Sequence, residues 1–154
     1  MHSLDLNKIG QQWIDAATHK RQFKVLSMLD KSVILNPPFM EERVSGMANV
    51  CGIFLAFSGL TTNFHYGRIL HNDHPNQNRE LILEFKTDIE GKTMHAADFI
   101  KLNDKGQIIE MKVVARSPEA VKALGKAAHN MPFLLKLRIS ASKALINFYL
   151  KFRS

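Results

Sequence analysis

The sequence predicts an α+β fold, in which helices pack on an antiparallel sheet, because its hydrophobic period changes once along the chain. Up to Gly59 the apolar residues recur mostly with helical spacing, whereas from Thr61 to Arg116 apolar and polar residues alternate as they do in strands. Tight-turn signals separate the later strands, and strands joined in this way run antiparallel. A chain of 154 residues can bury a core as one domain.

The first half of the chain predicts three helices and one short strand. Residues 6–19 and 23–30 each place apolar side chains on one helical face. Residues 32–36 are apolar and β-branched, so they predict a strand that two prolines stop. The third helix is expected to begin at a Ser45 cap, to be buried on most sides, and to end at Gly59.

The second half predicts a meander of strands followed by a helix. The strands are expected at residues 61–70, 80–89, 93–102 and 107–116. Tight turns are expected at residues 90–92 and 103–106, where Gly91 and Gly106 lie. A further helix is expected to start with Ser117 as its cap and Pro118 at its first position.

The positive charge of the protein is concentrated at its C-terminal end. The net charge is +7, from 21 basic and 14 acidic residues, and seven of the basic residues follow Glu119, after which no acidic residue occurs. Residues 1–119 therefore carry no net charge, which argues against a globular domain that binds nucleic acid. We expect no nucleic-acid partner.

Other features limit the compartment and the chemistry. The first residues show no basic segment followed by an apolar run, so we expect no secretory signal and a cytoplasmic location. Cys51, the one cysteine, lies in an apolar run and is interpreted as a buried small residue. No histidine or acidic residues show metal-ligand spacing, so we expect no metal and no other cofactor.

Residues 97–111, ADFIKLNDKGQIIEM, resemble the paired C-terminal strands of the nuclear-transport-factor-two-like superfamily, which includes SnoaL-like and ketosteroid-isomerase-like proteins. In that superfamily an acid on one strand is followed by a turn and a returning strand. The resemblance covers roughly residues 5–125. It implies a cone-shaped, cystatin-like roll, with N-terminal helices packed on a strongly bent antiparallel sheet around one apolar pocket. We place this domain at residues 1–131.

The same resemblance implies roles for three residues. Asp98 falls where ketosteroid isomerases keep a protonated acid that donates a hydrogen bond to an oxyanion. Asn36 falls where they keep the carboxylate that moves the proton, and an amide is no general base at neutral pH. Trp13 falls near their oxyanion tyrosine. Steroid isomerisation is therefore not expected.

Alternation along the strands suggests which side chains reach the pocket. Asp98 shares a face with apolar neighbours, so it is expected to be desolvated and to act as an acid, or else to be a structural hydrogen-bonded acid. His65 would supply a base if it points inward beside Asp98; otherwise it is a partly exposed strand histidine. The expected pocket residues are Trp13, Asn36, Phe54, Phe85, Ala96, Ile100, Met111 and Ala115.

Residues 132–154 are basic, apolar and predicted to form an amphipathic helical extension. Three interactions are considered for this helix: packing on its own domain or on a dimer partner, weak contact with an anionic membrane, or contact with nucleic acid. Packing within a homodimer is the interpretation we favour.

For the whole protein we expect binding of a small apolar ligand, with metal-free acid/base chemistry of the isomerase, cyclase or lyase type. The alternatives are a non-catalytic dimerisation module and a peripheral membrane protein.

Overall fold

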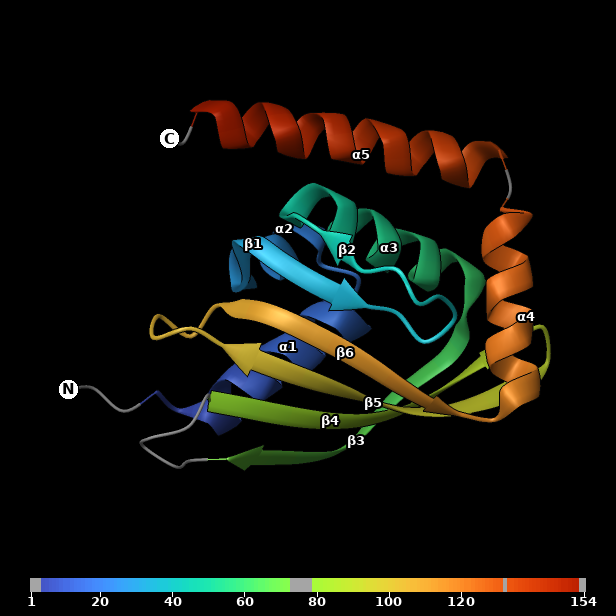
Figure 1. Cartoon of the computed structure of the whole chain (residues 1–154), viewed down its shortest axis with the longest axis horizontal. Coiled ribbons are helices and arrows are strands. Elements are labelled where there is room, and N and C mark those ends of the chain that lie inside the picture. The colour runs from blue at the N-terminus through green and yellow to red at the C-terminus, as the bar shows by residue number, and fades with distance from the viewer. Residues whose placement is uncertain (1–3, 73–78, 132, 153–154) are drawn as a thin grey trace.

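Five helices and one six-stranded sheet make up the described part of the chain, as the predicted α+β class requires (Figure 1). The structure is a computed structural model that describes residues 4–72, 79–131 and 133–152. The helices are α1 (Leu6–Thr18), α2 (Gln22–Met28), α3 (Met47–Leu60), α4 (Pro118–His129) and α5 (Phe133–Phe152). The strands are β1 (Leu29–Asn36), β2 (Val44–Ser45), β3 (Thr62–Asn72), β4 (Arg79–Ile89), β5 (Lys92–Leu102) and β6 (Ile108–Arg116).

The sheet has the strand order β2-β1-β6-β5-β4-β3. Strands β3 to β6 form the predicted antiparallel meander, with Leu83 opposite Asp98 and Asp98 opposite Val113. The β4–β5 turn has Glu90 and Gly91 both at positive φ, 48° and 76°, which suits the twist of a two-residue hairpin. Strands β1 and β6 pair in parallel, a departure from the antiparallel expectation, because a long crossover through α3 and the meander joins them.

The third helix differs from the sequence prediction at both of its ends. Gly46, at a φ of 87°, is the N-cap, because Ser45 pairs with Ile34 as part of the short strand β2. The helix also continues through Gly59 to Leu60, so Gly59 does not end it. At α4 the position of Pro118 is as predicted, but the Ser117 side chain makes no capping hydrogen bond.

Figure 1 shows the layers that result, with α1 and α3 against the sheet and α5 outermost alongside α3. Alternation along β4 and β5 turns Leu81, Leu83, Met94 and Ile100 toward the helices, and each is at most 1% exposed. The helix α4 closes one end of this core by packing on β4, β5 and β6.

The last helix, α5, packs on its own chain. Ile146 of α5 is 3% exposed and belongs to the same core cluster as Val50 and Cys51 of α3. A Cβ atom at Gly52 would lie 3.2 Å from Cγ2 of Ile139, so the glycine permits this close approach. In the described part of the chain no helix is long and apolar enough to cross a membrane.

Adjacent residues of α5 provide a test of this packing. We expect Ile146→Ala to lower the free energy of unfolding by about 2–4 kcal/mol, because it deletes buried methyl groups and leaves a cavity. Leu145, next to it and 56% exposed, is the matched control, and Leu145→Ala should change stability by no more than about 0.5 kcal/mol. Urea unfolding measures both. Equal effects of the two changes would show that α5 does not dock through Ile146.

Candidate functional site

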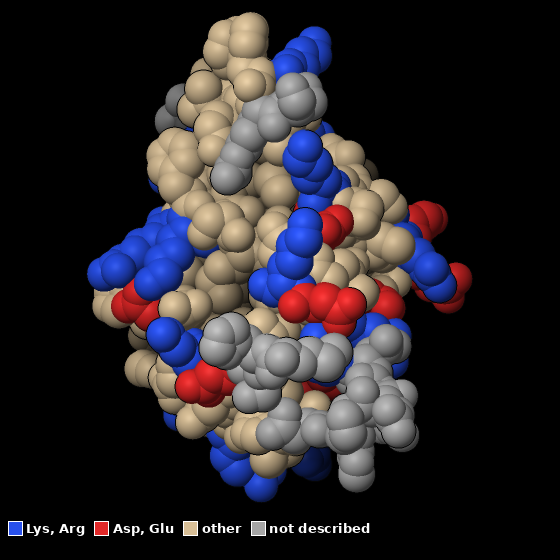
Figure 2. All heavy atoms as spheres, turned by 90° about the vertical axis from the view of Figure 1, so that its left-hand side faces the viewer, with Lys and Arg blue, Asp and Glu red and all other residues tan. Residues whose placement is uncertain are grey.

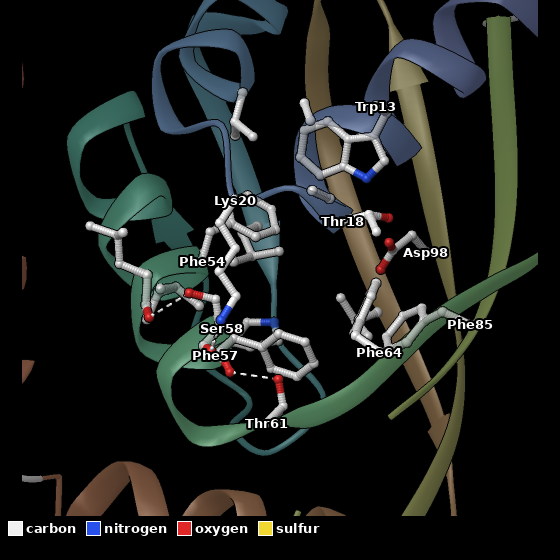
Figure 3. A pocket seen from close by; sticks show the side chains of 18 of the residues that line it. Trp13, Thr18, Lys20, Phe54, Phe57, Ser58, Thr61, Phe64, Phe85 and Asp98 are labelled. Atoms are coloured by element: carbon white, nitrogen blue, oxygen red, sulfur yellow. Dashed lines mark hydrogen bonds between the residues drawn. The ribbon is translucent and has the colours of Figure 1, made fainter. Parts of the chain in front are cut away.

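A cavity of about 300 Å³ lies between the helices α1, α2 and α3 and the inner face of the sheet (Figure 3). Its wall is mostly apolar, and Figure 3 shows Phe54 and Phe57 of α3 on the side opposite Trp13 and Asp98. Aromatic rings fix this wall: Trp13 meets Phe54 edge-on with centroids 5.3 Å apart, and Phe64 stacks on Phe85 at 5.0 Å. Such edge and stacked contacts hold the rings in defined places.

One hydrogen-bonded chain of polar groups runs through this apolar wall. The indole Nε1–H of Trp13 donates to the hydroxyl of Tyr66 at 3.0 Å, and that hydroxyl donates to Oδ2 of Asp98 at 3.3 Å. The three residues come from α1, β3 and β5, so the tertiary fold alone brings them together. Because the tyrosine uses its proton toward Asp98 and its oxygen toward Trp13, its orientation is fixed from both sides.

The environment of Asp98 changes its acidity. The residue is 5% exposed, and burial raises the pKa of its carboxyl from 3.8 to about 7, although the hydrogen bond from Tyr66 works in the opposite direction. The pKa of Tyr66 is raised well above 10, first by burial and then by the neighbouring Asp98. At neutral pH the tyrosine is therefore a neutral donor, while Asp98 is present in both its acid and its carboxylate forms.

The second oxygen of Asp98 faces the cavity. None of the described residues donates a hydrogen bond to Oδ1, and the described part of the chain contains no fully buried side-chain oxygen or nitrogen that lacks a partner. Oδ1 must therefore be accessible from the cavity that Asp98 lines. This oxygen can accept a hydrogen bond from a ligand, or donate one when the acid is protonated.

Polar side chains mark one end of the cavity, where α1 and α3 end and β3 begins. Thr18, Lys20 and Asn63 line the cavity and are exposed, so this end is its mouth. The ammonium Nζ of Lys20 donates to the backbone oxygen of Ser58 at 3.2 Å and so ties the α1–α2 connection to the end of α3. A ligand would enter past these groups and reach Asp98 in the apolar interior.

The structure places four of the predicted site residues, Trp13, Phe54, Phe85 and Asp98, on the cavity wall. Four others of the predicted set do not line it. Ile100 and Met111 are buried in the main core, whereas Ala96 and Ala115 pack in the smaller core cluster beneath α4. Strand alternation predicted which side chains point toward the helices, but only some of these side chains line the cavity.

Asn36 also lies away from the cavity. Its amide Nδ2 donates to Oε1 of Glu110 at 3.4 Å on the neighbouring strand β6, and Leu35 is the residue of β1 on the cavity wall. Successive side chains of a strand point to opposite faces, so a one-residue difference in register separates these positions. Position 36, to which the resemblance assigned the base, therefore does not face the cavity, whereas its apolar neighbour Leu35 does.

His65 does not meet Asp98, because it lies on the exposed face of β3. Its neighbours Phe64 and Tyr66 point inward instead, and Tyr66 is the hydrogen-bond partner of Asp98 that His65 was expected to be. The signal was present in the sequence, since two large aromatic residues flank His65 and strand alternation places both on one face. The histidine could turn inward only if both aromatic rings turned outward.

Cys51 also lines the cavity, and burial raises the pKa of its thiol to about 12. At neutral pH it is therefore a thiol and a weak nucleophile. Within the ranges that the structure describes, no three histidine, cysteine or acidic side chains lie close enough together to hold a metal ion.

The sequence of this chain matches no protein-family model and no curated protein. Solved structures do match its fold. A protein with a cystatin-like fold from Silicibacter pomeroyi is 20% identical, with a TM-score of 0.73 over 87% of this chain and 93% of that one. A steroid delta-isomerase from Pseudomonas aeruginosa is 18% identical, with a TM-score of 0.72 over 81% of this chain and 89% of the isomerase.

An epoxide hydrolase/cyclase-like enzyme of pyran ring formation in the polyether salinomycin is 14% identical. Its TM-score is 0.58 over 74% of this chain and 92% of the enzyme. These similarities, together with those to NTF2-like proteins of unknown function, confirm the nuclear-transport-factor-two-like, cystatin-like fold that the sequence resemblance implied. At such low identity they establish the fold and leave function to the site itself.

The raised pKa of Asp98 predicts how stability depends on pH. The folded protein keeps this proton up to about pH 7, whereas the unfolded chain loses it near 3.8, so the stabilisation is complete at low pH and is lost as pH rises through 7. Relative to Asp98→Asn, the wild type should therefore lose on the order of 4 kcal/mol of unfolding free energy between about pH 3 and pH 8. Urea unfolding of both proteins across this range measures the difference. A difference that is constant with pH would mean that Asp98 titrates normally in the fold.

Proposed function

We propose that this protein binds a small, largely apolar molecule that carries one polar oxygen, with that oxygen against Asp98. The observation that carries the proposal is a buried carboxyl with one oxygen unpaired by the described residues, inside an otherwise apolar cavity. Oδ1 is accessible from the cavity, and an apolar ligand would bury it without a partner, which costs free energy; a ligand that pairs with Oδ1 is therefore favoured over a pure hydrocarbon. The cavity volume is at the small end of ligand pockets, and its aromatic wall suits a compact ring system.

Asp98 also has the properties of a proton carrier. With a pKa of about 7 it can give up and take back a proton at neutral pH, which general acid–base catalysis requires. The Tyr66 hydroxyl stabilises the carboxylate form of Asp98, because it donates a hydrogen bond to Oδ2. We therefore propose metal-free acid/base chemistry of the isomerase, cyclase or lyase type. The names of two structural neighbours, a steroid isomerase and a cyclase-like enzyme, support this class.

Trp13, the single tryptophan, lies in the cavity wall and reports directly on binding. We expect the ketone 1-decalone to quench its fluorescence and to bind about three- to tenfold more tightly than the hydrocarbon decalin, the gain of one hydrogen bond. The preference should be largest below pH 7, where protonated Asp98 donates, and should decline as pH rises through 7. Asp98→Asn, whose amide also donates, should keep the preference at every pH, whereas Asp98→Leu should lose it. Equal binding of ketone and hydrocarbon by the wild type would contradict the proposal.

Steroid isomerisation provides a separate test of the site. We expect no turnover of a 3-keto-Δ5 steroid, because that reaction uses an acid at the oxyanion and a separate base, and Asp98 is the one carboxyl among the described residues that line the cavity. Asn36→Asp should not create activity either, since that side chain points toward Glu110 and away from the cavity. The conversion is followed by the ultraviolet absorbance of the conjugated product. Turnover gained in Asn36→Asp would show that position 36 reaches the ligand after all.

A further inference from the structure

The helix α5 has two apolar faces, and the protein covers only one of them. Ile139, Ile146 and Leu150 recur at helical spacing on the inner face, where α5 packs on α3. On the opposite face the apolar side chains are open to solvent. They are Leu137, Leu145, Phe148, Tyr149 and Phe152, which are 54–76% exposed. We call these five residues the outer face of α5.

This surface gathers three exposed aromatic side chains, those of Phe148, Tyr149 and Phe152. Phe148 and Phe152 are one helical turn apart and touch, with ring centroids 4.6 Å apart. They are 62% and 76% exposed, although either side chain would gain from leaving water. A contiguous exposed apolar stripe of this kind marks a contact surface.

The charge around the outer face has a single sign. Lys136, Arg138, Lys143 and Lys151 lie on α5, and the sequence contains no acidic residue after Glu119. Lys136, Lys143 and Lys151 are seven or eight residues apart, which places them along one edge of the helix between its two apolar faces. In Figure 2, which looks toward the C-terminal end of α5, the coloured atoms at the top of the molecule belong to Lys, Arg or residues other than Asp and Glu, and the acidic residues lie lower.

The shape of the molecule exposes this face over its whole length. Figure 1 shows α5 as the outermost layer, lying lengthwise along one side of the molecule with nothing beyond it. A helix of 20 residues presents roughly 30 Å of straight edge. A long straight ridge can meet a flat surface along all of its length without a change in fold.

We propose that the outer face of α5 docks this protein on an anionic lipid bilayer. The aromatic and leucine side chains enter the boundary between headgroups and acyl chains, as in interfacial amphipathic helices. The basic residues at its edge extend their charged ends to the lipid phosphates while their alkyl stems stay with the apolar groups.

A second copy of the chain fits this face less well than lipid does. In a symmetric dimer the same patch meets itself, so two basic helices, neither of which carries an acidic side chain, would face one another. The outer surface of the sheet is different, because Arg68 pairs there with Glu84, and Lys101 with Glu110. Charge complementarity thus points α5 toward an anionic partner.

The test is sedimentation of the full-length chain with phosphatidylcholine vesicles that contain about 30% phosphatidylglycerol, at about 0.1 M salt. We expect the wild type to sediment with these vesicles and not with pure phosphatidylcholine vesicles, and to be released as salt rises to about 1 M, where charges are screened within 3 Å. Phe148→Ser with Phe152→Ser should weaken binding at least roughly tenfold, because two apolar side chains that enter the bilayer are lost. Lys136→Gln with Arg138→Gln should weaken binding to the anionic vesicles.

Matched control variants distinguish binding through α5 from non-specific binding through other exposed apolar or basic side chains. Phe23 of α2 is 74% exposed, so Phe23→Ser removes an equally exposed ring elsewhere and should leave binding unchanged. Lys92 and Lys105 lie exposed at turns of the body, and Lys92→Gln with Lys105→Gln should have a smaller effect than the α5 pair. Light scattering of the wild type and of the Phe148/Phe152 variant gives the oligomeric state. Absence of vesicle binding by the wild type, equal binding by the Phe148/Phe152 variant, or a dimer that this variant converts to a monomer would each overturn the proposal.

Discussion

The site depends on one buried carboxyl held in an apolar cavity. Asp98 is placed there by the alternation of β5 and is kept by the hydrogen bond from Tyr66, which Trp13 orients in turn. Burial disfavours its charged form and so raises its pKa to about 7, at a cost that the rest of the core must offset. The same burial favours the ligand binding that we propose. Oδ1 has no hydrogen-bond partner among the described residues, so a ligand oxygen that reaches it forms a hydrogen bond that the protein does not supply.

Much of the fold could be predicted because local signals and the global architecture agree. The alternation of Leu81, Leu83 and Phe85 and the turn at Gly91 specify the meander, and Pro118 marks the start of α4. The parallel pairing of β1 with β6 was not predictable in this way. It joins segments more than 70 residues apart, and no local pattern records which edge of the meander the first strand will meet.

Strand alternation alone was enough to predict which face Asp98 occupies. It could not predict the register of β1 or the hydrogen-bond partner of Asp98. Asp98 was placed on the inner face by alternation. Asn36 was assigned to the site by resemblance, and one residue of register puts Leu35 there instead. The partner of Asp98 is Tyr66 rather than His65, because Phe64 and Tyr66 bury more apolar surface than the histidine would.

The central claim is that Asp98 is a neutral-range acid whose free oxygen faces a ligand cavity. Nuclear magnetic resonance of the protein labelled with ¹³C at the aspartate carboxyl carbons, with Asp98→Asn to assign the signal, follows this titration directly. The account predicts a pKa near 7, and a further rise when 1-decalone binds, because a ketone accepts a hydrogen bond only from the protonated form. A pKa near 4 that the ketone leaves unchanged would contradict it.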